Sequence, residues 1–328
     1  MIMDVPGWCE KWLGSVPVRE LFRTGHLSVV LGVELADGRA VVLKRRPAAD
    51  RVQGCVEVQR HLARVGFPCP APLTDAVPLA GRTTTGPSGA WTVTAPSGAW
   101  TVTAPSGAWT VTAEAYVPGG AQLERGADRA RLFAEALARF VRLAPSPDAV
   151  SSVAPAPPWV GWAHGSAGVW PWPDDMDVDL NTRPGPAWLD DLGRRVRERL
   201  LAVRHAPVIG HGDWESQNLR WQGHRLHAVH DWDSVVCLPE PAIAGAAAAV
   251  FTETGEPFET ATIDETGRFL AVYGGGAGWG TEEHEIAWAA GLWVRAFNAK
   301  KASLTAGGAR VLDRLAHEAK TRLRRAGA

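Results

Sequence analysis

The segment HGDWESQN at residues 211–218, followed by VHDWD at residues 229–233, says most about the architecture of this chain. These segments supply a carboxylate at Asp213, a carboxamide at Asn218 and a second carboxylate at Asp231. A tight loop can present Asp213 and Asn218 at one cleft, and Asp231 follows a short apolar run that we expect to be a strand. Carboxylate and amide oxygens suit a hard cation such as Mg²⁺. The three side chains therefore predict a metal-assisted site.

This set of side chains suits phosphoryl transfer, which depends on positioning and charge neutralisation more than on covalent chemistry. In such a reaction an Asp can orient or accept the proton of a substrate hydroxyl while an Asn holds magnesium. Each residue alone would be more typical of a turn or a cap. Together, with strand signals upstream, they predict a small-molecule kinase that uses ATP and Mg²⁺.

The composition narrows the class of protein. The chain has 328 residues, 46% of them hydrophobic and 21% charged, which is ordinary for a globular protein with two lobes. A net charge of −1 argues against a nucleic-acid binder. The four cysteines form no CxxC pair, and no apolar run approaches the ~20 residues that cross a bilayer. We expect a cytoplasmic protein with no signal peptide and no nucleic-acid or membrane partner, and the sequence favours no oligomeric state.

The first third of the chain is rich in strand signals. Apolar runs at 27–33 and 39–44 flank an Asp-Gly pair at 37–38, a strong hairpin signal. Residues 1–24 are expected to be an irregular or helical lead-in, and residues 49–65 a helix.

A perfect repeat follows, in which PSGAWTVTA occupies residues 87–95, 96–104 and 105–113. Each copy joins a Pro-Ser-Gly turn to a Trp-Thr-Val-Thr strand. We interpret the repeat as a tandem expansion of one strand and its turn, of which the fold needs only the last copy. The earlier copies could extend a sheet edge or form a loop, and a dedicated binding array is the alternative.

The chain changes character at the Pro-Gly-Gly sequence of residues 118–120. Beyond it, apolar residues recur with a helical period. Helices are expected at 127–143, 187–204 and 282–304.

The residues quoted first resemble the catalytic loop and the metal loop of the aminoglycoside phosphotransferase family. That family has the protein-kinase-like fold and includes antibiotic kinases and choline-type kinases. The resemblance covers about residues 20–300 of the chain. It implies that Asp213 is the catalytic base and that Asn218 and Asp231 are magnesium ligands.

The resemblance also implies an α+β, two-lobed fold with a small β-rich N-lobe and a larger, mainly helical C-lobe. Residues 1–117 would form the nucleotide-binding lobe, with the nine-residue repeats at 87–113. Residues 118–328 would hold the catalytic loop, the metal loop and the substrate site.

In the N-lobe, Lys44 resembles the strand lysine that contacts the α and β phosphates of ATP. Glu57 in the following helix resembles its ion-pair partner. Glu114 and Tyr116 lie in a segment that resembles the hinge, where backbone groups would hold the adenine. Arg45 and Arg46 compete for the position of the lysine, but Lys44 ends the apolar run and is the better candidate.

One feature departs from the pattern of protein kinases. The loop over the phosphates would fall at residues 24–28, which contain one glycine where a Gly-x-Gly-x-x-Gly run is usual. We expect Ser28 or backbone N–H groups there to assist Lys44 in holding the nucleotide.

The acceptor would be a small polar molecule with a hydroxyl group, such as an aminoglycoside, an amino sugar or a choline-like alcohol. Asp174 and Asp175 belong to an acidic loop beside Trp residues, and Glu253 and Asp233 add negative charge. Carboxylates and aromatic faces suit a cationic acceptor. The same loop could equally be a solvated acidic turn.

Two other functions remain open from the sequence. A nucleotide-binding pseudokinase or regulatory protein would share the fold without catalysis. A metal-dependent hydrolase would use a cluster of imidazole and carboxylate groups. Five histidines fall close together in the chain: His205, His211, His224, His227 and His230.

Overall fold

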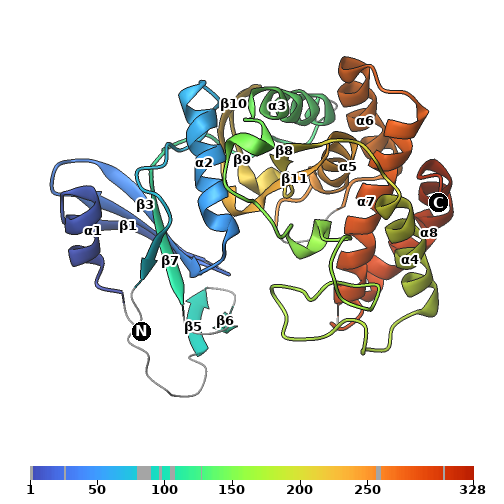
Figure 1. The fold of residues 1–328 in the computed structure, drawn as a ribbon, viewed down its shortest axis with the longest axis horizontal. Coiled ribbons are helices and arrows are strands. Elements are labelled where there is room, and N and C mark those ends of the chain that lie inside the picture. The colour runs from blue at the N-terminus through green and yellow to red at the C-terminus, as the bar shows by residue number, and fades with distance from the viewer. Residues whose placement is uncertain are drawn as a thin grey trace. The chain divides into compact units, whose positions relative to one another are not determined.

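The computed structural model describes residues 3–25, 27–79, 90–95, 98–103, 108–126, 128–255, 260–305 and 307–328 (Figure 1). The chain divides into two compact units, Met1–Pro118 and Gly119–Ala328. Among the described residues, no helix is long and apolar enough to cross a membrane.

The first unit is built on a five-stranded antiparallel sheet (Figure 1). The expected hairpin forms its centre, with Gly38 at a φ of 85° in the turn. A backbone with positive φ favours glycine, which explains the Asp-Gly pair there. The strands in spatial order are β1 (Pro17–Thr24), β2 (Val29–Leu35), β3 (Ala40–Pro47), β7 (Trp109–Ala115) and β4 (Val77–Leu79).

The lead-in to this sheet differs from the expectation. Helix α1 (Val5–Leu13) is followed by strand β1, where an irregular or helical segment was predicted up to residue 24. The β1 strand lies at the sheet edge and is largely exposed, so it lacks the apolar alternation that marks a half-buried strand.

Alternation along the strands gives the sheet two different faces. One face packs Leu31, Val33 and Leu43 against Trp8 and Leu13 of α1. The other face carries Lys44 and Glu114 and contacts helix α2 (Arg51–Arg64) through Gln59. Lys44 is therefore held on the α2 side of the sheet.

The three copies of the repeat have different positions in the sheets. Strands β5 (Ala90–Ala95) and β6 (Gly98–Thr103), from the first two copies, pair with each other in a separate antiparallel hairpin. The third copy supplies β7, which lies between β3 and β4. Residues 80–89 and 104–107, where the expected Pro-Ser-Gly turns of the first and third copies fall, lie outside the described residues.

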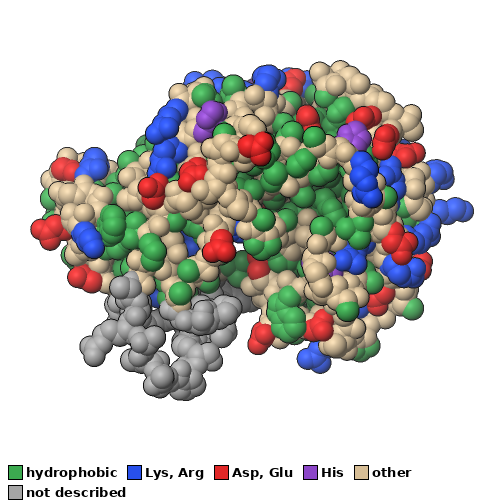
Figure 2. Space-filling view, in the orientation of Figure 1, with side chains coloured by type: hydrophobic (Ala, Val, Ile, Leu, Met, Phe, Trp, Pro, Cys, Tyr) green, Lys and Arg blue, Asp and Glu red, His purple; other side chains and the backbone are tan. Residues whose placement is uncertain are grey.

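The second unit is mainly helical (Figure 1). Two small antiparallel sheets hold the central motif: β8 (Pro207–His211) pairs with β11 (Val235–Pro239), and β9 (Leu219–Gln222) pairs with β10 (Arg225–Val229). Acidic and basic side chains are interspersed on the face of this unit seen in Figure 2. Its helices are α3 (Arg129–Leu143), α4 (Ala187–Leu201), α5 (Glu240–Val250), α6 (Ile263–Ala277), α7 (Thr281–Ala302) and α8 (Ala309–Arg325).

Helices α5 and α7 form the buried centre of this unit. A Cβ added at Gly245 would lie 1.9 Å from the carbonyl oxygen of Ala287, so the two helix backbones are in direct contact there. Helix α5 also supports the strand that leads to the central motif, because Ile243 fills the space beside Gly210 of β8. Gly245 therefore allows the close contact between α5 and α7, and Gly210 allows the close contact between α5 and β8.

Candidate active site

Asp213 follows strand β8 in a loop that is held on several sides. The Gly212 N–H donates to the Ser234 carbonyl at 2.7 Å, and Trp159 Nε1 donates to the Gly212 carbonyl at 2.9 Å. His211 is fully buried, and its Nδ1 accepts from the Asp213 N–H at 3.2 Å. Its Nε2 lies 3.2 Å from the His230 carbonyl, so the imidazole carries its proton on Nε2 and joins the two loops.

Asn218 contacts Asp213 directly. It lies in a 3₁₀ turn (Ser216–Asn218), and its Nδ2 donates to Asp213 Oδ2 at 2.9 Å and to the Asp213 carbonyl at 3.1 Å. The amide nitrogen is thus committed to Asp213. The other polar atom of this amide, Asn218 Oδ1, is the one that could bind a cation.

Asp231 follows β10 with an unusual backbone conformation. Its φ is 59°, the only positive value at a non-glycine residue in the part of the chain that the structure describes. Asp tolerates this left-handed region better than most residues, and such conformations cluster at functional sites. Ser234 Oγ donates to Asp231 Oδ2 at 2.6 Å, which fixes the direction of the carboxylate.

The carboxylates near Asp213 alter its ionisation. Burial raises the pKa of Asp213 well above its usual value, and the charges of Glu215 and Asp231 raise it further. Asp213 and Asp231 are therefore close enough to repel each other. A cation bound by Asn218 and Asp231 would relieve this repulsion, so the residues present fit a magnesium ion.

A second pair of carboxyl groups adjoins Asp213. Burial raises the pKa of Glu215 to about 8, with a contribution from the charge of Glu253, and burial likewise raises the pKa of Glu253 to about 8. Glu253 is 4% exposed, and its Oε1 has no hydrogen-bond partner within the described parts of the chain. The prediction included Glu253 but missed Glu215, although Glu215 lies inside the quoted motif.

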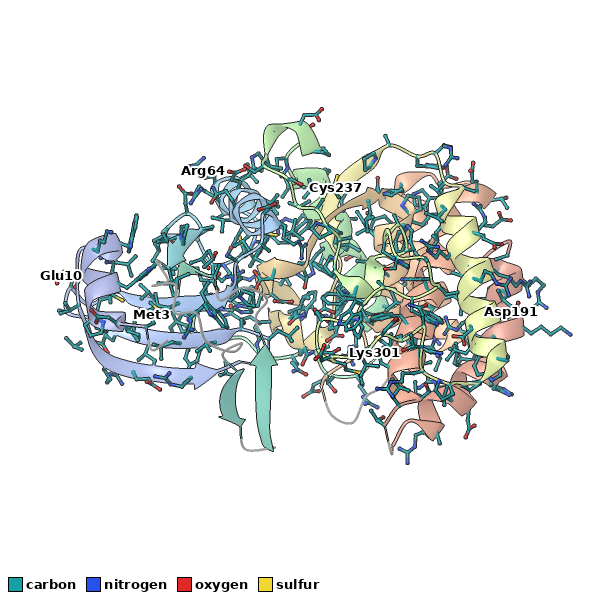
Figure 3. All side chains as sticks on the ribbon, turned by 60° about the horizontal axis from the view of Figure 1, so that its bottom comes forward. Met3, Glu10, Arg64, Asp191, Cys237 and Lys301 are labelled. Carbon is teal, nitrogen blue, oxygen red and sulfur yellow. The ribbon has the colours of Figure 1, made fainter. Side chains whose placement is uncertain are left out.

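The other residues predicted to bind the acceptor have different surroundings. Asp175 forms an ion pair with Lys301 of α7, which is labelled in Figure 3. This neutralises the charge that was expected to attract a cationic substrate. Asp174 is exposed in the same loop, and Asp233 is half-buried in the 3₁₀ turn after Asp231.

In the first unit, Lys44 pairs with a different carboxylate from the one expected. Lys44 Nζ lies 3.0 Å from Glu114 Oε1, whereas Glu57 Oε1 accepts a hydrogen bond from Gln53 Nε2 at 2.9 Å. Helix periodicity alone did not show which side of α2 faces the strand. The structure thus assigns the lysine to Glu114 and corrects the expected pair with Glu57.

In the segment expected to be the hinge, two backbone N–H groups already donate hydrogen bonds within the first unit. The Ala115 N–H donates to the Ala71 carbonyl at 2.9 Å, and the Tyr116 N–H donates to the Ala40 carbonyl at 3.0 Å. Both N–H groups already donate to backbone carbonyls of the first unit, so neither is available to an adenine. The Tyr116 ring, 37% exposed, lies against Phe22 with ring centroids 5.7 Å apart.

The loop that contains Ser28 is tightly folded. Gly25 has a φ of 151°, and a Cβ added there would lie 1.9 Å from the Ser28 carbonyl oxygen. Only glycine permits this approach, which explains the single glycine of the loop. Ser28 itself is half-buried, and His26 lies outside the described residues.

Among the described residues, no group of three or more His, Cys, Asp and Glu side chains is placed to hold a metal ion by itself. His211 is committed to hydrogen bonds that join two loops. The predicted magnesium site differs in kind, since Mg²⁺ usually takes one or two protein carboxylates and completes its shell with phosphates and water.

A β-rich first unit and a mainly helical second unit are the architecture expected of a protein-kinase-like fold. A model of the phosphotransferase enzyme family matches residues 21–240, more than half of the chain, and the chain belongs to this family. No curated protein sequence matches the chain.

Solved structures show the same fold at low sequence identity. Amicoumacin kinase hAmiN, in complex with AMP-PNP, Ca²⁺ and its ligand, is 11% identical with a TM-score of 0.60, covering 98% of this chain and 94% of its own. A thermostable mutant of aminoglycoside phosphotransferase APH(4)-Ia, in a ternary complex with ADP and hygromycin B, is 12% identical with a TM-score of 0.56, covering 99% of this chain and 100% of its own. A fructosamine-3-kinase-like protein from Thermobifida fusca is 17% identical with a TM-score of 0.51, covering 99% and 100%. The α+β, kinase-like fold is confirmed.

Proposed function

We propose that the protein is a kinase that transfers the γ-phosphate of ATP to a hydroxyl group of a small polar molecule. The observation that carries the proposal is the contact between Asp213 and Asn218, with the charge of Asp231 close enough to raise the pKa of Asp213. Membership in the phosphotransferase enzyme family supports the reaction class. Two of the three solved structures named above contain adenine nucleotides, and one of these two also contains a metal ion.

In this proposal Asp213 acts as the base. The hydrogen bond from Asn218 Nδ2 fixes its carboxylate, and the network around His211 fixes its backbone. Asp213 would hold the acceptor hydroxyl and take its proton as the phosphoryl group transfers. Asn218 Oδ1 and Asp231 would hold Mg²⁺, which when bound neutralises charge on the phosphates.

The same reasoning assigns the nucleotide groups of the first unit. Lys44 is proposed to contact the phosphates of ATP, and the tight loop at Ser28 to contribute backbone N–H groups. Because the N–H groups of Ala115 and Tyr116 are committed, adenine recognition near Glu114 would rely on other backbone atoms.

The acceptor is proposed to carry a positive or strongly hydrogen-bonding group. Glu253 is buried and Glu215 is half-buried, and their charges reach each other and Asp213. A cationic amine placed there would favour their ionised forms and compensate the buried charge. This favours amino-bearing alcohols over neutral sugars.

A screen for ATP consumption over aminoglycosides, amino sugars, choline and other alcohols tests the proposal. We expect turnover with at least one acceptor. Asp213→Asn, which keeps the shape of the side chain, should lower this turnover to a few per cent of that of the unmodified protein. The matched variant Asp148→Asn, outside the motif, is expected to leave turnover unchanged. Nucleotide binding without turnover of any acceptor in the screen would instead favour the alternative that the protein is a pseudokinase.

A further inference from the structure

The surroundings of Lys44 assign a role to a residue on the neighbouring strand. The strand register pairs Val42 with Glu114 and Lys44 with Thr112. Lys44 and Glu114 therefore lie on the same face of adjacent strands, in a diagonal pair offset by two residues. Their side chains are 12% and 8% exposed, and the Nζ–Oε1 distance is 3.0 Å.

The second oxygen of the Glu114 carboxylate is also held. Gln59 Nε2 donates to Glu114 Oε2 at 2.9 Å and to the Pro70 carbonyl at 2.8 Å. Gln59 is itself 3% exposed. Buried charges must be paired and hydrogen-bonded to be tolerated, and Glu114 meets both conditions.

Glu57 faces a different direction on α2. It lies two residues before Gln59, which corresponds to a rotation of about 200° around a helix. Gln59 faces the sheet, and Glu57 bonds Gln53 one turn earlier on the same helix. The α2 residue that contacts Glu114 is thus a glutamine, which carries no charge.

We propose that Glu114 is the positioning residue that orients Lys44 toward the nucleotide phosphates, with Gln59 holding Glu114 in turn. The inference rests on the proposed kinase function. Its consequence is that the sheet itself orients the lysine, through two hydrogen-bonded strands. The orientation then does not require a carboxylate carried by α2.

The test is the affinity of the full-length protein for Mg²⁺·AMP-PNP, measured by calorimetry in four variants. Glu114→Gln should weaken binding about tenfold or more, the scale of a lost charge-assisted hydrogen bond. Glu57→Gln should weaken it less than twofold, as should the matched control Glu20→Gln, an exposed residue of β1. Glu114→Asp should recover part of the loss.

A double-mutant cycle separates positioning from a merely structural role. In a Lys44→Met background, Glu114→Gln should cause less than a twofold further loss, because the lysine it orients is gone. An undiminished loss in that background would overturn the proposal. A tenfold loss of nucleotide affinity in Glu57→Gln would also overturn the proposal. This result can be obtained even if Glu114→Gln does not fold. If the unmodified protein binds no nucleotide, the proposed function fails first.

Discussion

The hydrogen bond from Asn218 to Asp213 supports a specific prediction for Asn218→Asp. The substitution keeps a side-chain oxygen that could bind a metal but replaces the donor Nδ2 with an acceptor. That acceptor would face Asp213 Oδ2 at the present 2.9 Å distance. Two carboxylates this close repel each other, and Asp213 already has a raised pKa because of burial and neighbouring carboxylates.

The expected loss follows from the bonds that are removed. One charge-assisted hydrogen bond contributes roughly 1.5–3 kcal/mol, and its loss at the reacting centre corresponds to about a 10- to 100-fold lower kcat. We expect Asn218→Ala to lose at least as much, since it also removes the proposed metal oxygen. Turnover with the best acceptor of the screen, at saturating ATP and Mg²⁺, measures both variants.

The control is Gln222→Glu, the same amide-to-carboxylate change at an exposed position of β9. It should alter kcat by less than twofold. If Asn218→Asp retains the kcat of the unmodified protein, the bond to Asp213 does not position the catalytic carboxylate, and the role given to Asn218 is wrong.

Three further predictions concern stability. Gly245→Ala should lower the free energy of unfolding by about 3 kcal/mol or more in urea titrations, because the added Cβ would lie 1.9 Å from the Ala287 carbonyl oxygen. The control Gly275→Ala should be neutral or slightly stabilising, because no atom lies within 4 Å of a Cβ added there. The pKa values of Glu215 and Glu253, raised to about 8 in the folded protein, mean that the folded state binds more protons than the unfolded one between about pH 4.5 and 8. The free energy of unfolding should therefore fall as pH rises through this window, and a pH series on Glu215→Gln should show a smaller fall; an unchanged slope would contradict the burial of this charge. Deleting residues 87–104 should change the melting temperature by only a few degrees, because the third repeat copy alone supplies β7; a collapse of folding would refute this.

The part of the site that the sequence predicted is local in the chain. Asp213 and Asn218 are five residues apart, so the loop length alone restricts how far they can separate. Asp231 was placed by the short apolar run before it, which is strand β10 in the structure. Hairpin and helix signals likewise identified β2, β3, α2, α3, α4 and α7 to within a few residues.

The contacts that were missed depend on register and on distant pairs. The partner of Lys44 is set by how β7 pairs with β3, and no local pattern encodes this pairing. Asp175 is neutralised by Lys301, which is 126 residues away in the chain. Glu215 could have been noticed inside the motif, but its proximity to Glu253 comes from tertiary packing.

The central claim is that Asp213, Asn218 and Asp231 converge on a magnesium-bound nucleotide that Lys44 also contacts. A crystal structure of the protein with Mg²⁺ and AMP-PNP tests it most directly. We expect a metal ion about 2.1 Å from Asn218 Oδ1 and from a carboxylate oxygen of Asp231, with Lys44 Nζ within hydrogen-bond reach of the phosphates. A bound nucleotide whose metal touches neither Asn218 nor Asp231 would contradict it.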